Sequence, residues 1–176
     1  DTSASQGEIV VDLVESEELD FQVVQLADNL ENPWGLAFLP DGDMLVTERP
    51  GRMNRVSPGG TVTPLTGLPE IRSVNQGGLL DVVLHPDYEN TGWIYFTYSN
   101  PQGEEVTSTT IARAQLEDDA LTNLETLYVQ DPPKEPGRHY GSRIVFLEDG
   151  TFLASIGDRG LRDPAQDTQD DAGVLL

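Results

Sequence analysis

The sequence has 176 residues, and 37% of them are apolar, which is enough for one domain or part of one. It carries 31 acidic and 10 basic residues, and the net charge of −21 predicts that nucleic acid is not a partner. No apolar run reaches about 18 residues, so the sequence predicts no membrane span. Cysteine is absent, which excludes disulfides, thiolate chemistry and cysteine-based zinc sites.

The charge bias and the start of the chain suggest where the protein works. Lys134 is the sole lysine, and the other basic residues are all arginine. A strongly acidic surface repels itself unless salt screens it, so a halophilic origin is preferred over an ordinary acidic exported protein. The chain opens with the small polar stretch DTSASQGE, which is typical of a processed leader, so we expect a periplasmic or secreted protein.

The pattern of apolar residues changes at residue 21. Residues 1–20 are rich in Glu, Asp and Ser and predict a partly ordered acidic N-terminal arm, with Val10–Val14 as a candidate edge strand. From Phe21 onward, short apolar runs alternate with Gly, Pro, Asn or Asp, which predicts an all-β domain over residues 21–176. Leu116–Leu127 has some helical character, but its Thr and Asn content favours a turn and a strand.

An internal repeat narrows the fold class. Three segments share one template, in which an apolar strand, an acidic turn with Gly or Pro, and a second apolar strand follow one another: Trp34–Glu48, Leu79–Ser99 and Ser142–Asp158. Their spacing suits the four-stranded blades of a β-propeller, and a β-sandwich would need no such repeated unit. About three blades fit into this chain, whereas propellers close with four to eight, so we expect an incomplete ring.

Four strings then resemble a known family in register. They are NPWGLAFLPDGDMLVTER at Asn32–Arg49, NQGGLLDVVLHPDY at Asn75–Tyr88, RHYGSRIVF at Arg138–Phe146 and IGDRGLRDPAQD at Ile156–Asp167. They occur in the same order as in the PQQ-dependent glucose/sorbosone dehydrogenases, and the likeness is greatest to the bacterial soluble aldose sugar dehydrogenases. The resemblance covers the chain from about Leu26 to its end, and four strings together are far more specific than any one alone.

The resemblance implies a six-bladed propeller that binds pyrroloquinoline quinone (PQQ) and calcium over its central channel. The implied reaction is oxidation of an aldose sugar at the anomeric carbon to the lactone, with hydride transfer to the quinone. Members of the family are about twice as long as this chain, and the segments that bind calcium would follow Leu176. We therefore expect a second chain, or a further C-terminal half, to complete the ring.

His139 is the candidate general base. Removal of the proton from an anomeric hydroxyl suits a neutral imidazole, and His139 in RHYGSRIVF matches the histidine that serves as base in the family. The family often has an acidic or amide residue before this histidine, whereas this chain has Arg138, and an adjacent cation favours the neutral ring. The other histidine, His85, lies in a predicted hairpin, where we expect a structural or surface role.

Gln76 and Arg162 are the candidate cofactor ligands. Gln76 offers a donor and an acceptor, the following glycines let the backbone approach a planar ligand, and the residue matches a cofactor-contacting glutamine of the family. A fixed cation stabilises charge that develops on a quinone oxygen, and the likeness to aldose dehydrogenases gives that catalytic and binding role to Arg162. In the glucose dehydrogenase branch the arginine falls one residue earlier, at Leu161 here. Arg159 is expected to be an ion-paired strand end.

The remaining polar and aromatic residues of note receive structural interpretations. The aspartates crowded after residue 157 form no calcium-loop motif, so an acidic surface is preferred and no metal site is predicted: Asp158, Asp163, Asp167, Asp170 and Asp171. The aromatic residues in strand patterns are expected in the core: Trp34, Trp93, Tyr95 and Phe96.

Two other functions compete with the dehydrogenase. Many propellers are non-catalytic scaffolds that bind sugar or protein, and the joint presence of Gln76, His139 and Arg162 at one mouth of the channel argues against that class. A calcium-dependent lactonase would need a central ring of Glu and Asn ligands, for which the sequence has no motif. The electron acceptor and the preferred sugar are not encoded in any motif of this chain.

Overall fold

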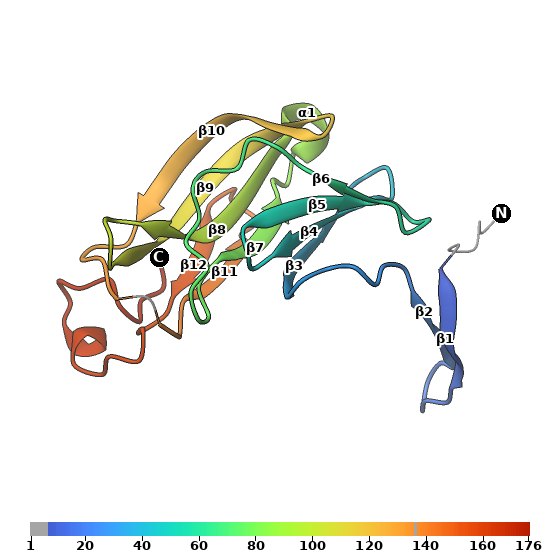
Figure 1. Ribbon diagram of the computed structural model, residues 1–176, viewed down its shortest axis with the longest axis horizontal. Helices are drawn as coiled ribbons and strands as arrows, with labels where there is room; N and C mark the ends of the chain where they lie inside the picture. Colours follow the sequence, from blue (N-terminus) through green and yellow to red (C-terminus); the bar gives the residue numbers. More distant parts are fainter. Residues whose placement is uncertain (1–6, 136) are drawn as a thin grey trace.

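The computed structural model describes residues 7–135 and 137–176, and nearly all of its regular structure is β-strand (Figure 1). The helical elements among these residues are α1 (Tyr88–Thr91) and one 3-10 turn at Pro164–Gln166. Every strand pairs with its neighbours in antiparallel fashion. The all-β prediction is confirmed.

Blade 1 is a four-stranded sheet that contains the first predicted repeat. Its strands lie in chain order: β3 (Pro33–Phe38), β4 (Met44–Glu48), β5 (Arg52–Val56) and β6 (Val62–Pro64). The turn between β3 and β4 has Gly42 at a φ of +93°, which is accessible to glycine without strain. The Asp41 carboxylate accepts a hydrogen bond from the backbone N–H of Asp43 at 3.0 Å, as an Asx-type turn requires.

Blade 2 repeats this plan with longer strands. It consists of β7 (Leu79–Leu84), β8 (Trp93–Pro101), β9 (Thr107–Glu117) and β10 (Ala120–Val129), with α1 in the first connection. The stretch Leu116–Leu127 is a turn followed by a strand, as predicted, and Asp118 takes a positive φ of 50° in that turn. Asp and Asn tolerate this conformation better than most residues do.

Blade 3 begins with the third predicted repeat. β11 (Gly141–Phe146) and β12 (Phe152–Ile156) form a hairpin. The residues after it return to pair with β12, because Ala154 and Leu176 exchange backbone hydrogen bonds of 3.0 and 2.9 Å. Two four-stranded blades and the hairpin that opens a third, each beginning with one predicted repeat, make this part of the chain a segment of a β-propeller.

The first strands of the three blades lie next to one another, with β7 in contact with both β3 and β11 (Figure 1). Apolar side chains fill the space between consecutive blades. The cluster that joins blades 1 and 2 includes Leu45, Met53, Leu79 and Phe96. The cluster that joins blades 2 and 3 includes Tyr95, Ile111, Ile144 and Ala154.

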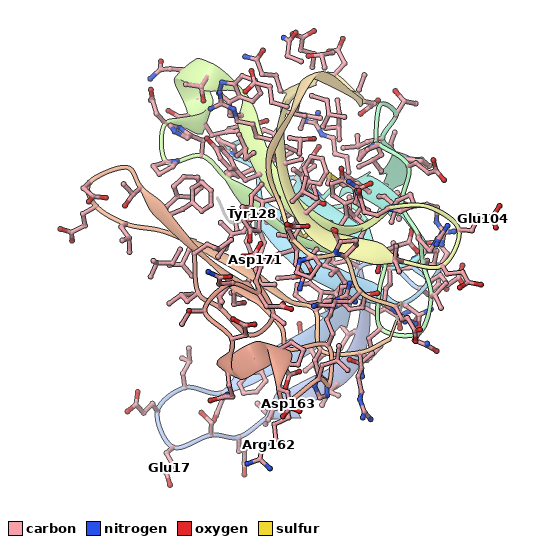
Figure 2. The ribbon with its side chains drawn as sticks, turned by 90° about the vertical axis from the view of Figure 1, so that its left-hand side faces the viewer. Glu17, Glu104, Tyr128, Arg162, Asp163 and Asp171 are labelled. Atoms are coloured by element: carbon pink, nitrogen blue, oxygen red, sulfur yellow. The ribbon has the colours of Figure 1, made fainter. Side chains whose placement is uncertain are left out.

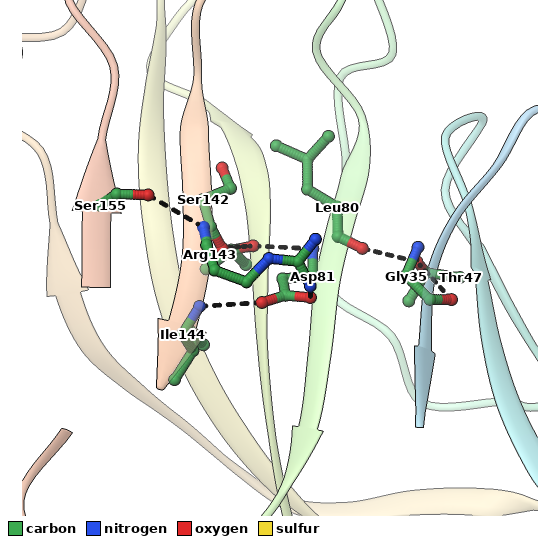
Figure 3. A network of polar contacts seen from close by, with 9 residues as sticks. Gly35, Thr47, Leu80, Asp81, Ser142, Arg143, Ile144 and Ser155 are labelled. Carbon is green, nitrogen blue, oxygen red and sulfur yellow. Dashed lines mark hydrogen bonds and ion pairs between the residues drawn. The ribbon is translucent and has the colours of Figure 1, made fainter. Parts of the chain in front are cut away.

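Buried polar contacts also run across the three blades (Figure 3). Thr47 in β4 donates from Oγ1 to the carbonyl oxygen of Leu80 in β7 at 2.5 Å. The next residue, Asp81, is fully buried and accepts two hydrogen bonds of 2.8 Å from β11, one from Arg143 Nη1 and one from the backbone N–H of Ile144. These directional contacts fix the rotation of each blade relative to the next, which apolar packing alone leaves freer.

A hairpin outside the blades contains the candidate edge strand. β1 (Glu8–Val14) pairs with β2 (Phe21–Gln25), and the hairpin extends away from the blades (Figure 1). The predicted boundary at residue 20 falls in the connection between these two strands. Among the described residues, no helix has the length and apolarity needed to cross a membrane.

Candidate functional site

The two candidate residues Gln76 and His139 come together at one end of the blades. Gln76 lies in the segment that precedes β7, and His139 lies in the segment that precedes β11. Because β7 and β11 are neighbouring first strands, the two segments meet at the same end. The backbone N–H of His139 donates to Gln76 Oε1 at 2.9 Å. The predicted proximity of these two residues is therefore present.

The His139 ring is oriented by Asp158. Its Nδ1 lies 2.7 Å from Asp158 Oδ1, and the same oxygen accepts the backbone N–H of Gly160 at 2.8 Å. The Gly160 N–H and the His139 ring together lower the pKa of Asp158 below its usual range. An ionised Asp158 accepts the proton on Nδ1, which leaves the lone pair of His139 on Nε2.

Two glycines make room for the turn that contains His139 and Tyr140. His139 itself has a φ of +55°. A Cβ on Gly157 would lie 1.7 Å from the His139 carbonyl oxygen, and a Cβ on Gly77 would lie 2.6 Å from Tyr140 Oη. The glycine of the IGD string and the first glycine of the QGG string are therefore required by packing around the His139 turn.

His139 opens onto a cavity of about 440 Å³, here called the His139 cavity. Its lining comes from all three blades: Trp34, Arg49, Gln76, Leu80, His139, Tyr140 and Gly141.

The four aromatic residues expected in the core differ in burial. The expectation that Trp34 is a core residue is wrong, because it is 36% exposed and lines the His139 cavity, with Arg143 5.3 Å from the ring centre. Tyr95 and Phe96 are buried as expected, and Trp93 is half-buried beneath Arg113.

Gln76 also lines a larger cleft of about 960 Å³, here called the Arg138 cleft. Its ionic lining residues are three cations, Lys134, Arg138 and Arg159, and one acid, Glu135. Lys134 is paired with Asp170 at 2.5 Å. In a chain with a net charge of −21, a concave surface with an excess of cations stands out. Such a surface suits an anionic ligand.

Arg159 does not form the ion pair that the sequence suggested. Its side chain is only 6% exposed, and no carboxylate in the described residues pairs with it. Instead, Nη2 donates to the carbonyl and hydroxyl oxygens of Thr107, both at 3.0 Å, and the guanidinium lies 3.5 Å from the centre of the Tyr140 ring. Burial lowers the pKa of Arg159 from its ordinary value.

Arg162 lies apart from these contacts. Its side chain is exposed and extends outward from the loop after β12 (Figure 2), and it lines neither the His139 cavity nor the Arg138 cleft. Leu161, the alternative position for the cofactor arginine, does line the Arg138 cleft. The structure thus brings together Gln76 and His139 but not Arg162, whose role stays a prediction.

Comparison with known proteins assigns the family. Residues 30–176 match the Glucose / Sorbosone dehydrogenase family. The chain belongs to this family. It is 37% identical over 155 residues to aldose sugar dehydrogenase YliI of Escherichia coli strain K12, and the match covers 86% of this chain and 42% of that protein.

Two further similar proteins support the same family assignment. Quinoprotein glucose dehydrogenase B of Acinetobacter calcoaceticus is 33% identical over 156 residues, which cover 82% of this chain and 32% of that protein. The structure of the PQQ-bound form of aldose sugar dehydrogenase from Streptomyces coelicolor matches with a TM-score of 0.76 and 30% identity, over 88% of this chain and 46% of that one. This member of the glucose/sorbosone dehydrogenase family thus spans less than half the length of the relatives it matches.

The aspartates of this family member are not all plain acidic surface. Asp158 binds the His139 ring, Asp170 pairs with Lys134, and Asp171 accepts the backbone N–H of Asp131 at 2.8 Å. No group of three or more metal-ligating side chains gathers anywhere in residues 7–135 and 137–176.

The sequence analysis did not predict that Asp158 contacts His139. The register of the β11–β12 hairpin would have indicated that the two residues are close. Gly141 pairs with Ile156, so His139 and Asp158 both lie two residues beyond the same pair. His85 has contacts of a structural kind, since it stacks on Tyr95 with ring centres 6.0 Å apart and its Nδ1 accepts the backbone N–H of Asp87 at 3.0 Å.

Proposed function

We propose that the complete protein oxidises an aldose at its anomeric carbon to the lactone, with PQQ as the bound cofactor. The family assignment and the names of the relatives support a sugar dehydrogenase, and a solved relative contains PQQ. The observation that carries the proposal for this chain is the His139 ring, held at Nδ1 by Asp158 beside Gln76 and next to an open cavity.

His139 acts as the general base in this proposal. Asp158 fixes the proton on Nδ1, so Nε2 is the atom that accepts the proton of the anomeric hydroxyl. The carboxylate also stabilises the imidazolium that forms when the ring takes up this proton. Gln76 supports the same geometry from the other side, because its carbonyl oxygen holds the His139 backbone N–H.

The residues present fit an anionic planar cofactor. PQQ is a tricarboxylate, and the Arg138 cleft has an excess of cations in an otherwise strongly acidic chain. Gln76 lines both this cleft and the His139 cavity, and its amide N–H groups suit a quinone or carboxylate oxygen. When bound, PQQ supplies the two-electron acceptor for the hydride that leaves the anomeric carbon.

Two further elements of the proposal lie outside the contacts described above. We propose that calcium ligands and the remaining blades come from residues beyond this chain or from a second chain, because three blades do not close a ring. Arg162 keeps its proposed role at the cofactor only if its loop turns toward the Arg138 cleft when the ring is complete.

The decisive experiment uses the complete protein loaded with PQQ and calcium. His139→Ala is expected to lower turnover of glucose by about 10² to 10⁴ while quinone affinity, measured by equilibrium dialysis, stays nearly unchanged. His85→Ala is the matched control, and we expect it to retain wild-type turnover. Wild-type turnover in His139→Ala would remove the catalytic assignment and favour a non-catalytic binding scaffold.

A further inference from the structure

Arg159 lines the Arg138 cleft, but it is a buried cation with no part in the proton transfer proposed for His139. It forms no carboxylate pair within the described residues, yet only 6% of it is exposed. Removing a charge from water without a counter-ion is unfavourable, and burial accordingly lowers the pKa of this guanidinium. Two hydrogen bonds to Thr107 and a cation–π contact with Tyr140 offset part of that penalty. Burial of Arg159 is therefore not expected to increase the stability of the fold, and its role must be a different one.

The contacts of Arg159 converge on the turn that carries His139. The backbone N–H of Arg159 donates to the carbonyl oxygen of His139 at 3.2 Å. The ring of Tyr140, the next residue, lies beneath the guanidinium, and its hydroxyl lies 3.2 Å from Thr107 Oγ1. The same Oγ1 accepts a hydrogen bond from Arg159 Nη2. Arg159 therefore fastens the His139–Tyr140 turn of blade 3 to strand β9 of blade 2.

The backbone at both ends of this contact needs such support. His139 has a φ of +55° and Arg159 a φ of +56°, a left-handed conformation that costs a non-glycine residue about 1 kcal/mol or more. Without tertiary contacts, both segments would relax toward the ordinary region. Asp158 precedes Arg159 in the chain and contacts the His139 ring. Relaxation of the backbone at His139 or at Arg159 would therefore move the ring away from the Asp158 carboxylate.

We propose that Arg159 is a positioning residue, which holds the His139 ring against Asp158 by anchoring Tyr140 to Thr107. This inference rests on the proposed function for the role of His139 in catalysis, but not for the position of the ring. Arg159 itself touches no reacting atom in this scheme. Its effect is transmitted through the turn, so its removal should change the state of the His139 ring as well as turnover.

The test is the tautomer of His139, measured from the ring ¹⁵N chemical shifts of the complete protein labelled at histidine. The His139 signals are assigned by their loss in His139→Gln. In the wild type we expect the Nδ1–H tautomer, fixed by Asp158. In Arg159→Met, which keeps an unbranched, flexible side chain but removes the charge and the donors, we expect a mixture of tautomers. Turnover should fall by about 10- to 100-fold while the KM for the sugar stays unchanged.

Two controls separate positioning from general damage. The signal of His85 should be unchanged in Arg159→Met if the fold is intact. Arg113→Met removes another arginine that lies over an aromatic ring, at 4.3 Å from the centre of Trp93, and should leave His139 as in the wild type. If Arg159→Met does not fold, Thr107→Val removes the shared hydroxyl while keeping the shape of the side chain, and we expect the same loss of a single tautomer.

The outcomes distinguish this inference from the proposed function. An unchanged His139 tautomer in a folded Arg159→Met or Thr107→Val overturns the positioning role, whatever happens to turnover. A mixed tautomer with reduced turnover supports both proposals. A mixed tautomer with wild-type turnover would keep the positioning role and contradict catalysis by His139.

Discussion

Two buried charges link blade 2 to blade 3, and they are accommodated in different ways. Asp81 is fully buried in β7 and accepts hydrogen bonds from Arg143 and from the backbone N–H of Ile144. Arg159 is 6% exposed and relies on neutral oxygens and an aromatic face. The anion has a cationic partner that reaches it from the neighbouring blade, whereas the cation has no anionic partner in the described residues.

A buried charge can contribute to the stability of the fold or to the geometry of its neighbours. The Asp81 carboxylate accepts a buried backbone N–H at the interface between blades, so its removal leaves that donor buried without a partner, whereas the exposed Arg143 side chain can return to water. An arginine without a counter-ion contributes little net stability, but its fixed, forked donors place its neighbours accurately. Asp81 should therefore matter for stability and Arg159 for geometry.

The largest effect is expected for Asp81→Ala. This change leaves the buried N–H of Ile144 without its acceptor and Arg143 without its carboxylate, so the free energy of unfolding should fall by about 3 kcal/mol. Denaturant titration of the complete protein measures it. Asp41→Ala is the matched control, because the Asp41 carboxylate is 53% exposed and its ion pair with Arg55 should contribute less than about 1 kcal/mol. Equal losses in the two variants would contradict the comparison.

The next effect concerns pH. Burial raises the pKa of Asp81 above its ordinary value of 3.8, against the opposing influence of the Ile144 N–H and Arg143. The unfolded chain therefore releases this proton at lower pH than the folded protein does. Below pH 3.8, Asp81 is protonated in both states and its charge costs the folded protein nothing. As the pH rises from 3.8 to the raised pKa of the folded protein, the free energy of unfolding falls by about 1.4 kcal/mol per unit of difference between the two pKa values.

Comparison of the wild type with Asp81→Asn isolates this term. The unfolding free energy of the wild type minus that of the variant should decrease as pH rises from about 3.5 to about 6, since the amide does not titrate. An increase over the same range would mean that Arg143 holds the pKa of Asp81 below its ordinary value instead.

A smaller effect is expected from salt. The surface carries most of the 31 acidic residues, and screening their mutual repulsion should raise the melting temperature by about 2 to 4 °C between 0.1 and about 2 M KCl. Both buried charges are shielded from the solvent, so the effect of Asp81→Ala on stability should not change with salt. A melting temperature that stays flat or falls would count against salt adaptation.

The smallest change in stability is expected for Arg159→Met. Loss of the hydrogen bonds to Thr107 is offset by removal of a desolvated charge, so the free energy of unfolding should change by less than about 1 kcal/mol. Thermal and denaturant unfolding measure this value. A loss as large as that of Asp81→Ala would show that both charges serve stability, and the contrast between them would disappear.

Much of the fold could be predicted because its signals are local. Alternating apolar residues and acidic Gly or Pro turns marked all three hairpins that open the blades, and the Thr and Asn content of Leu116–Leu127 correctly favoured a turn and a strand. The site was only partly predictable. The placement of His139 and Gln76 at one end of the blades followed from the family resemblance of their motifs, but the burial of Arg159 and the exposure of Trp34 did not, because neither residue type specifies its environment.

The β-strands, their pairing into hairpins and the repeat of the blades are encoded locally, because strand periodicity and turn chemistry act over a few residues. The charges that meet across blades depend on long-range packing instead. Asp158 reaches His139 through the register of one hairpin, whereas Arg159 reaches Thr107 from a different blade. Contacts between blades depend on the rotation of whole sheets, which is set by the sum of many packed side chains and is not encoded in any single motif.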